Sequence, residues 1–192
     1  MISKPLSAGE KAKTAKDLGL ISRLVAAGRG MGMRIIVFGG YGVDGFLGQI
    51  TRPHHDVDVQ IYGIEEDGSA VIQKLLVAAK FVSYEVEDKG KEDYYHNLVY
   101  THEETVLDIY YLHTQSSPLG SEKYILKLDG TMEKQVFDTP ILGKIGVHTF
   151  EVQNPKVELE DKVHKRNVRG DQMRPEHDQD IENLQNYISS RA

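Results

Sequence analysis

The chain has 192 residues, of which 40% are apolar and 27% are charged, and its formal net charge is −6. This length suits one domain of ordinary size or a domain with a helical appendage, and the composition is that of a soluble globular protein. The chain has no basic tract and no cysteine, which argues against a nucleic-acid partner and excludes disulfides and thiolate zinc sites. We also expect a cytoplasmic protein with no membrane partner, because no stretch is apolar enough to span a bilayer.

An N-terminal helix is predicted over residues 7–27. Ser7 suits the N-cap position, and Glu10, three residues further on, would complete a capping box. Apolar residues recur near one face, and the Lys-rich opposite face is expected to be solvated. Gly28 then ends the helix and begins the loop into the next segment.

The chain is organised around residues 34–62. An apolar, β-prone run at 35–38 stops at two glycines, Gly39 and Gly40, where the backbone can come close to a bulky neighbour. Residues 41–47 can form two helical turns, and the second strand, at 56–61, alternates polar and apolar side chains. Segments 34–38 and 56–61 should be neighbouring strands of one sheet.

Two aspartates share one face of the second strand. With a period of two, Asp56 and Asp58 point to one side and the intervening valines to the other. Two carboxylates placed so close repel each other, and a hard divalent cation such as Mg²⁺ relieves the conflict while leaving room for substrate phosphates. The alternative is an exposed edge strand with solvated acids. The glycine turn that precedes the acids favours the metal site.

This combination resembles the nucleotidyltransferase superfamily that includes DNA polymerase β, and most closely its lincosamide and aminoglycoside 2''-nucleotidyltransferases. The motif of these enzymes is Gly-Gly-aromatic-small-apolar-Asp, then Leu-Gly, then Thr-Arg-x-His-x-Asp-apolar-Asp. Tyr41 stands where those families commonly carry tryptophan. The matching residues here are Gly39-Gly40-Tyr41-Gly42-Val43-Asp44, Leu47-Gly48, and Thr51-Arg52-Pro53-His54-His55-Asp56-Val57-Asp58.

The resemblance implies an α+β nucleotidyltransferase fold, with a mixed β-sheet flanked by helices. It implies a nucleotidyltransferase domain over residues 1–152 and a C-terminal helical segment, 153–192, packed on it. It also implies a magnesium-dependent enzyme, with two Mg²⁺ ions, that moves AMP from ATP or another nucleoside triphosphate onto a hydroxyl of a small acceptor. An aminoglycoside or a lincosamide antibiotic is the expected acceptor, pyrophosphate is the second product, and an oligomer remains open.

A third acid lies in a later strand. Residues 94–101 and 105–112 look like an antiparallel pair, and Asp108 sits inside the apolar run of the second. An acid flanked in this way is costly unless it has a partner. An edge position facing water is one interpretation. The other is the third carboxylate of the metal site, which would either bind metal or act as the general base for the attacking hydroxyl.

The nucleotide phosphates should lie over Gly39 and Gly40, whose backbone amides can approach them. Arg52 is the natural phosphate partner because its fork matches phosphate oxygens. His54 would orient the loop or contact phosphate, since adjacent histidines with no third ligand at a familiar spacing do not indicate zinc. Asp44 would fasten Arg52 or the loop by an ion pair.

The remaining elements follow from periodicity and turn signals. Helices are expected at 66–80, 155–169 and 175–188, the second capped by Asn154. Strands are expected at 81–86, 124–128, 135–137 and 144–152, with a charged turn at 87–92 and a hairpin turn at Asp129 and Gly130.

The C-terminal segment offers two weaker signals. Lys162 belongs, with His164, Lys165 and Arg166, to a basic cluster that is expected to be a solvated face, and among these cations Lys162 is the best candidate to reach a triphosphate. Residues 174–180 are similar to the Arg-Pro-Lys-Asp-x-x-Asp of many such enzymes, but Glu176 replaces the lysine. The acceptor is expected near the C-terminal helices and Tyr94, Tyr95 and Tyr111, whose rings can hold a sugar or a cation.

Two other functions remain open from the sequence. One is a module of the same fold that adenylylates a protein or RNA partner, as an antitoxin-like protein would. The other is a non-catalytic nucleotide-binding module. The presence of all three acids argues against a degenerate site, and the low basicity argues against RNA.

Overall fold

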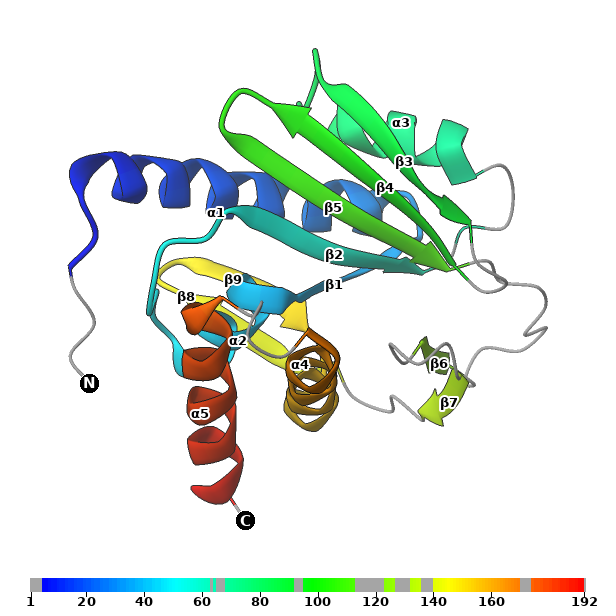
Figure 1. The fold of residues 1–192 in the computed structure, drawn as a ribbon. Coiled ribbons are helices and arrows are strands. Elements are labelled where there is room, and N and C mark those ends of the chain that lie inside the picture. Colours follow the sequence, from blue (N-terminus) through cyan, green and yellow to red (C-terminus); the bar gives the residue numbers. More distant parts are fainter. Residues whose placement is uncertain are drawn as a thin grey trace.

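A computed structural model describes residues 5–62, 64, 68–91, 95–112, 123–126, 132–135, 140–169 and 174–191. A seven-stranded mixed sheet dominates it (Figure 1), with strand order β3-β4-β5-β2-β1-β9-β8. The strands are β1 (Arg34–Phe38), β2 (Asp56–Tyr62), β3 (Glu85–Lys91), β4 (Tyr95–His102), β5 (Thr105–Leu112), β8 (Leu142–Ile145) and β9 (His148–Val152), and a separate two-stranded sheet pairs β6 (Lys123–Leu126) with β7 (Met132–Gln135).

The helices are α1 (Ala8–Gly30), α2 (Gly39–Leu47), α3 (Gly68–Ala78), α4 (Pro155–Arg169) and α5 (Pro175–Ser189). Figure 1 shows α1 and α3 behind the sheet, and α2, α4 and α5 grouped near β8 and β9. The expected α+β class, with a mixed sheet and C-terminal helices, is confirmed. Among the described residues, no helix is both long enough and apolar enough to cross a membrane.

Helix α1 begins where its cap was predicted. The Ser7 hydroxyl accepts the Glu10 N–H at 3.3 Å, and the Glu10 carboxylate accepts the Ser7 N–H at 2.7 Å, so the capping box is complete. The buried side chains of α1 join the main core beneath the sheet: Leu18, Leu20, Ile21 and Leu24.

The central strands pair as expected. β1 runs antiparallel to β2, with Phe38 opposite Asp58, and β2 runs parallel to β5. Val57, Val59 and Ile61 are fully buried on the α1 side, so period-two alternation correctly predicted which face of β2 is apolar. The predicted antiparallel pairing of β4 with β5 is also confirmed.

One strand was wrongly placed by the sequence patterns. Residues 81–86 were expected to form a strand followed by a charged turn, but the strand is β3, over Glu85–Lys91. Positive φ angles at Lys80 and Ser83 interrupt the backbone just before it. Among the described strands, β3 pairs only with β4, and charged side chains are tolerated on such an edge strand because they face water.

The segment expected as one strand over 144–152 is a hairpin. Gly146, at φ +58°, turns the chain between β8 and β9, which pair antiparallel. Helix α2 packs closely on this hairpin, since a Cβ on Gly143 would lie 3.0 Å from Cα of Gly45. The hairpin thus holds α2 against the edge of the sheet.

The C-terminal helices occur where they were predicted. Asn154 caps α4 through its side-chain oxygen, which accepts the Lys156 N–H at 2.9 Å, and Pro175 opens α5. Helix α3 ends at Ala78, two residues before the expected end, and its expected first two residues, 66–67, lie outside the described residues. The expected hairpin turn at residues 129–130 lies outside the described residues.

Candidate active site

The first part of the site is the turn between β1 and α2. Helix α2 begins directly at Gly39, two residues earlier than expected, and its N-cap residue, Phe38, provides no side-chain hydrogen bond. Gly39 has φ +65°, and a Cβ there would collide with the Asp58 carboxylate. This position therefore requires glycine for both its backbone conformation and its close approach to an acid.

Three aspartates meet on the face of the sheet opposite α1. Asp56 and Asp58 lie two residues apart on β2, and the parallel register places Asp108 of β5 directly beside Asp58. Sheet pairing thus brings the three sequence-predicted acids onto one face. The Asn97 amide, from β4, donates to the Asp108 carboxylate.

These acids oppose each other electrostatically. Burial, followed by the charges of Asp56 and Asp108, holds the pKa of Asp58 well above its usual range. Burial also raises the pKa of Asp108, against the Asn97 hydrogen bond, which lowers it. Within the described part of the chain, no group donates a hydrogen bond to the carboxylates of Asp56 or Asp58.

The donor chemistry suits a divalent metal ion, since a cation would relieve this repulsion and Mg²⁺ prefers carboxylate oxygens. No group of three or more His, Asp or Glu side chains in the described chain forms a ready-made metal site. A metal at these acids would accordingly need part of its ligand set from elsewhere, as ions that bind with substrate phosphates do.

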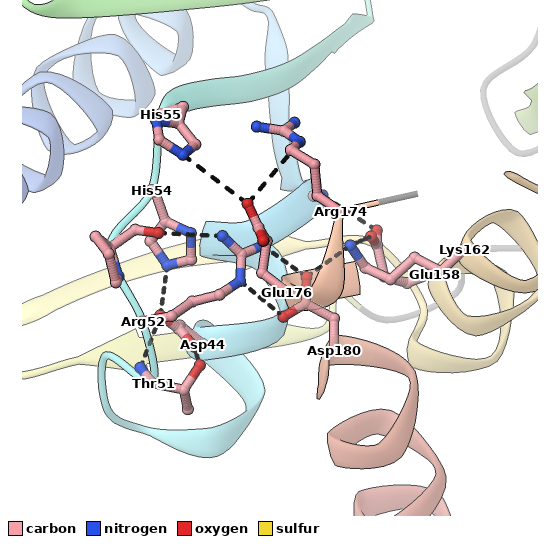
Figure 2. A network of polar contacts seen from close by, with 12 residues as sticks. Asp44, Thr51, Arg52, His54, His55, Glu158, Lys162, Arg174, Glu176 and Asp180 are labelled. Atoms are coloured by element: carbon pink, nitrogen blue, oxygen red, sulfur yellow. Dashed lines mark hydrogen bonds and ion pairs between the residues drawn. The ribbon is translucent and has the colours of Figure 1, made fainter. Parts of the chain in front are cut away.

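The loop before β2 is fastened to α2 through Asp44. This carboxylate is fully buried and accepts from the Thr51 hydroxyl at 2.6 Å and the Thr51 backbone N–H at 3.1 Å. Its Oδ2 lies 2.6 Å from Nε2 of His54 (Figure 2). A Cβ on Gly40 would collide with the same imidazole. His54 therefore orients the loop, and Gly40 is needed for the room that His54 occupies.

Arg52 faces α5 rather than the sheet. Its Nε and Nη2 donate to the two oxygens of Asp180 at 3.1 and 2.7 Å, and its Nη1 donates to the Pro53 carbonyl at 3.2 Å (Figure 2). Burial lowers the pKa of Arg52, but the hydrogen bond and charge of Asp180 outweigh it, so the pKa is raised. The fork expected to hold phosphate thus holds the start of α5.

Lys162 is buried between two acids. Its Nζ lies 3.0 Å from Asp180 and 3.4 Å from Glu158, and the residue is only 4% exposed. Burial lowers the pKa of Lys162, but Glu158 and Asp180 outweigh this, so the net shift is upward and the lysine stays charged. The prediction that its helix face is solvated is wrong at this position. Lys162 instead ties α4 to α5.

Glu158 and Asp180 were missed by the sequence patterns. Glu158 is 3% exposed and accepts the backbone N–H of Gly39 at 3.3 Å, so it contacts the glycine turn between β1 and α2 directly. Its i, i+4 spacing to Lys162 was a visible signal. For Asp180 the only signal was the resemblance of residues 174–180 to the family segment, because its partner Arg52 is 128 residues away.

A second polar chain links the acid side of the sheet to α4. Gln60 of β2 donates to Gln153 at 3.0 Å, and Gln153 donates to Asp161 at 3.1 Å. Burial, with the nearby Glu158 charge, raises the pKa of Asp161 to about 6. Asp161 was not a sequence-predicted site residue.

Of the three tyrosines expected around the acceptor, Tyr111 is the one whose side chain lies in the described part of the chain. Tyr111 alternates away from Asp108 on β5 and is 3% exposed, and a Cβ on Gly68 of α3 would collide with its ring. The prediction that Tyr111 holds the acceptor is therefore wrong. Tyr110 points to the acid face instead, with its ring 5.4 Å from that of Phe38. Tyr94 lies outside the described residues, as does the Tyr95 side chain.

The model of one protein family matches this chain over residues 20–184, and its description is aminoglycoside-2''-adenylyltransferase. The match covers β1, the three aspartates, α4 and α5 as far as Leu184, so it includes every residue of the site described above. No curated protein sequence gives a match.

Two solved structures of similar fold are those of antibiotic-modifying enzymes. A crystal structure of ANT(2'')-Ia in complex with adenylyl-2''-tobramycin superposes with a TM-score of 0.57 at 15% identity, covering 92% of this chain and 91% of that one. The lincosamide antibiotic adenylyltransferase LnuA, lincomycin-bound, gives a TM-score of 0.58 at 18% identity, covering 95% and 98%. At these identities the likeness shows the nucleotidyltransferase fold.

Proposed function

Because the chain belongs to the aminoglycoside-2''-adenylyltransferase family, and is thus a nucleotidyltransferase of the antibiotic-modifying kind, we propose that it transfers AMP from ATP to a hydroxyl of a small antibiotic. An aminoglycoside or a lincosamide is the proposed acceptor. The two solved enzymes of similar fold carry adenylyl-2''-tobramycin and lincomycin, which supports both acceptor classes.

The observation that carries this proposal is the set of three carboxylates beside the glycine turn. Asp56, Asp58 and Asp108 share one face of the sheet, and Gly39 packs against Asp58 at the start of α2. A phosphate bound over that turn would meet the N-terminal end of a helix, which favours anions. Its α-phosphorus would then lie near the acids.

The reaction forms a bond between the acceptor oxygen and the α-phosphorus and breaks the bond from that phosphorus to the oxygen bridging to the β-phosphorus. The hydroxyl proton passes to a base, and pyrophosphate leaves. Asp56 and Asp58 would hold Mg²⁺, with Asp108 as a third ligand in some states. When bound, two such ions would stabilise the attacking and departing oxygens.

Asp108 is the proposed general base. Burial raises its pKa, which brings a carboxylate closer to the working range of a base, and Asn97 donates to it and fixes its orientation. A position inside a paired strand also holds the group rigidly.

Four residues are proposed to form the nucleotide site, two by contact and two by positioning. Gly39 and Gly40 would present backbone amides to the phosphates. His54 and Arg52 would act by holding the loop and α5 in place, since their hydrogen-bond partners are Asp44 and Asp180. The domain boundary after residue 152 stays a prediction.

A pyrophosphate-release screen tests the function. The protein is incubated with Mg²⁺, with each of the four nucleoside triphosphates in turn, and with representative aminoglycosides and lincosamides. We expect release that requires both a triphosphate and one of these acceptors, with ATP as the best donor. Release with no acceptor dependence in any combination would contradict the proposal.

A further inference from the structure

Glu158 accepts a hydrogen bond from the Gly39 backbone amide, which a bound nucleotide would be expected to use. Its Oε2 accepts the Gly39 N–H at 3.3 Å, and its Oε1 lies 3.4 Å from Nζ of Lys162 (Figure 2). This N–H is the first of α2 and has no side-chain cap from its own segment. A buried carboxylate therefore satisfies, from another helix, the amide at the head of the phosphate-binding turn.

A phosphate oxygen could readily replace the Glu158 carboxylate at the Gly39 N–H. A nitrogen-to-oxygen distance of 3.3 Å is longer than the usual value of about 2.9 Å for such a hydrogen bond. A carboxylate oxygen and a phosphate oxygen are both anionic acceptors, so they compete for one N–H. They also repel each other, so both cannot occupy the turn at low cost.

The surroundings let Glu158 leave without moving its helix. Lys162 anchors α4 to Asp180 at 3.0 Å on one side, and Asp161 accepts from Gln153 at 3.1 Å on the other. Lys162 also follows Glu158 by one helical turn and already contacts it. Because Oε1 of Glu158 already contacts this cation, the carboxylate keeps a charged partner when Oε2 gives up the Gly39 amide.

We propose that Glu158 is a built-in phosphate mimic, which holds the Gly39 amide in the ligand-free chain and gives it up to a triphosphate by turning toward Lys162. The inference rests on the proposed function, because it requires a polyphosphate as the natural ligand. It deepens that function by naming a residue that lowers affinity. When Glu158 returns to Gly39, it also competes with the departing pyrophosphate and so promotes product release.

Binding of inorganic tripolyphosphate, measured by calorimetry in the presence of Mg²⁺, tests the competition without any acceptor or nucleobase. Glu158→Gln removes the competing charge, and we expect it to tighten binding by about tenfold, the effect of relieving one close like-charge contact. Glu160→Gln is the matched control, because it removes the same charge from an exposed position on the same helix. It should change affinity by less than about twofold.

Glu158→Asp guards against a folding defect in the first variant. It keeps a charge beside Lys162, but its shorter side chain does not reach the Gly39 amide, so binding should again tighten. The Gly39 amide resonance provides a readout independent of affinity. Adding tripolyphosphate to the wild-type protein should shift this resonance. The Glu158→Gln substitution alone should also shift it, whereas Glu160→Gln should not.

The outcomes separate the two proposals. If wild type releases pyrophosphate in the acceptor screen, but the folded Glu158 variants bind tripolyphosphate no more tightly than wild type, the phosphate-mimic role is wrong and the function stands. If wild type binds neither tripolyphosphate nor ATP, the proposed function fails and this inference fails with it.

Discussion

Two aspartates on opposite faces of the sheet show how burial alone fails to identify a functional acid. Asp17, on α1, is fully buried, and its carboxylate accepts from Lys13 at 2.7 Å, Tyr41 at 2.8 Å and Thr105 at 3.0 Å. Asp58, on the other face, is surrounded by Asp56 and Asp108 instead of donors. A satisfied carboxylate stabilises the fold, whereas a repelled one suits the role proposed for Asp58, which is to bind a cation.

The largest effect should come from removing a repelled acid. Asp56→Asn or Asp58→Asn should reduce AMP transfer by at least about a hundredfold, the scale of losing a key transition-state interaction. Neither change should lower the unfolding temperature, because each removes like-charge repulsion. Activity assays paired with thermal unfolding measure both. Near-normal magnesium-dependent turnover in both variants would place the chemistry elsewhere.

The next largest effect should come from substituting Asp108, and its form distinguishes a general base from a metal ligand. If it is the base, Asp108→Asn should lower kcat by about a hundredfold, at the low end of what general-base catalysis contributes, and the acidic limb of the pH–rate profile should vanish. If it is chiefly a ligand, excess Mg²⁺ should restore part of the rate. The measurement is kcat against pH at saturating and at excess magnesium. An unchanged profile with near-normal kcat would remove Asp108 from the site.

Removing the satisfied acid should have the opposite pattern. Asp17→Ala leaves the hydroxyls of Tyr41 and Thr105 without their acceptor, so the free energy of unfolding should fall by about 1–3 kcal/mol. Transfer by the folded fraction should stay within about twofold of wild type. Urea unfolding and activity at a temperature below both transitions test this. A large loss of kcat with normal stability would show that the comparison between the two acids is wrong.

The smallest effect should come from substituting Asp161, which should change how the stability of the protein depends on pH. Its folded-state pKa of about 6 lies above its ordinary value of 3.8, so the folded state binds more protons between these values and stability falls as pH rises from about 4 to 6. Asp161→Asn should remove about 2 kcal/mol of this decline, at about 1.4 kcal/mol per unit. Urea unfolding of wild type and variant at pH 4 and pH 7 measures it. Equal pH dependence in the two proteins would contradict the shift.

Much of the site was predictable because it depends on local patterns. Alternation on β2 placed Asp56 and Asp58 together, and the single acid inside the apolar run of β5 indicated Asp108. The edge strand β3 was placed wrongly, because a strand exposed to water needs no apolar alternation. The charged residues of β3 were therefore interpreted as a turn. Regular period-two alternation exists only where one face is buried.

The C-terminal half of the site was not predictable in the same way. Whether Arg52 meets a phosphate or Asp180 depends on where α5 packs, and the two residues are 128 positions apart. The same holds for Glu158 and Gly39, 119 positions apart. Helix spacing shows which side chains share a face, but not which distant amide that face will meet.

Mass spectrometry of the acceptor after incubation with ATP and Mg²⁺ tests the central claim most directly. The wild-type protein should convert an aminoglycoside or a lincosamide to an adduct carrying one AMP unit, and Asp58→Asn should yield none within the same time. An adduct formed equally well by both proteins, or no adduct with any acceptor of either class, would contradict the claim that the three-aspartate face is an antibiotic adenylyltransferase site.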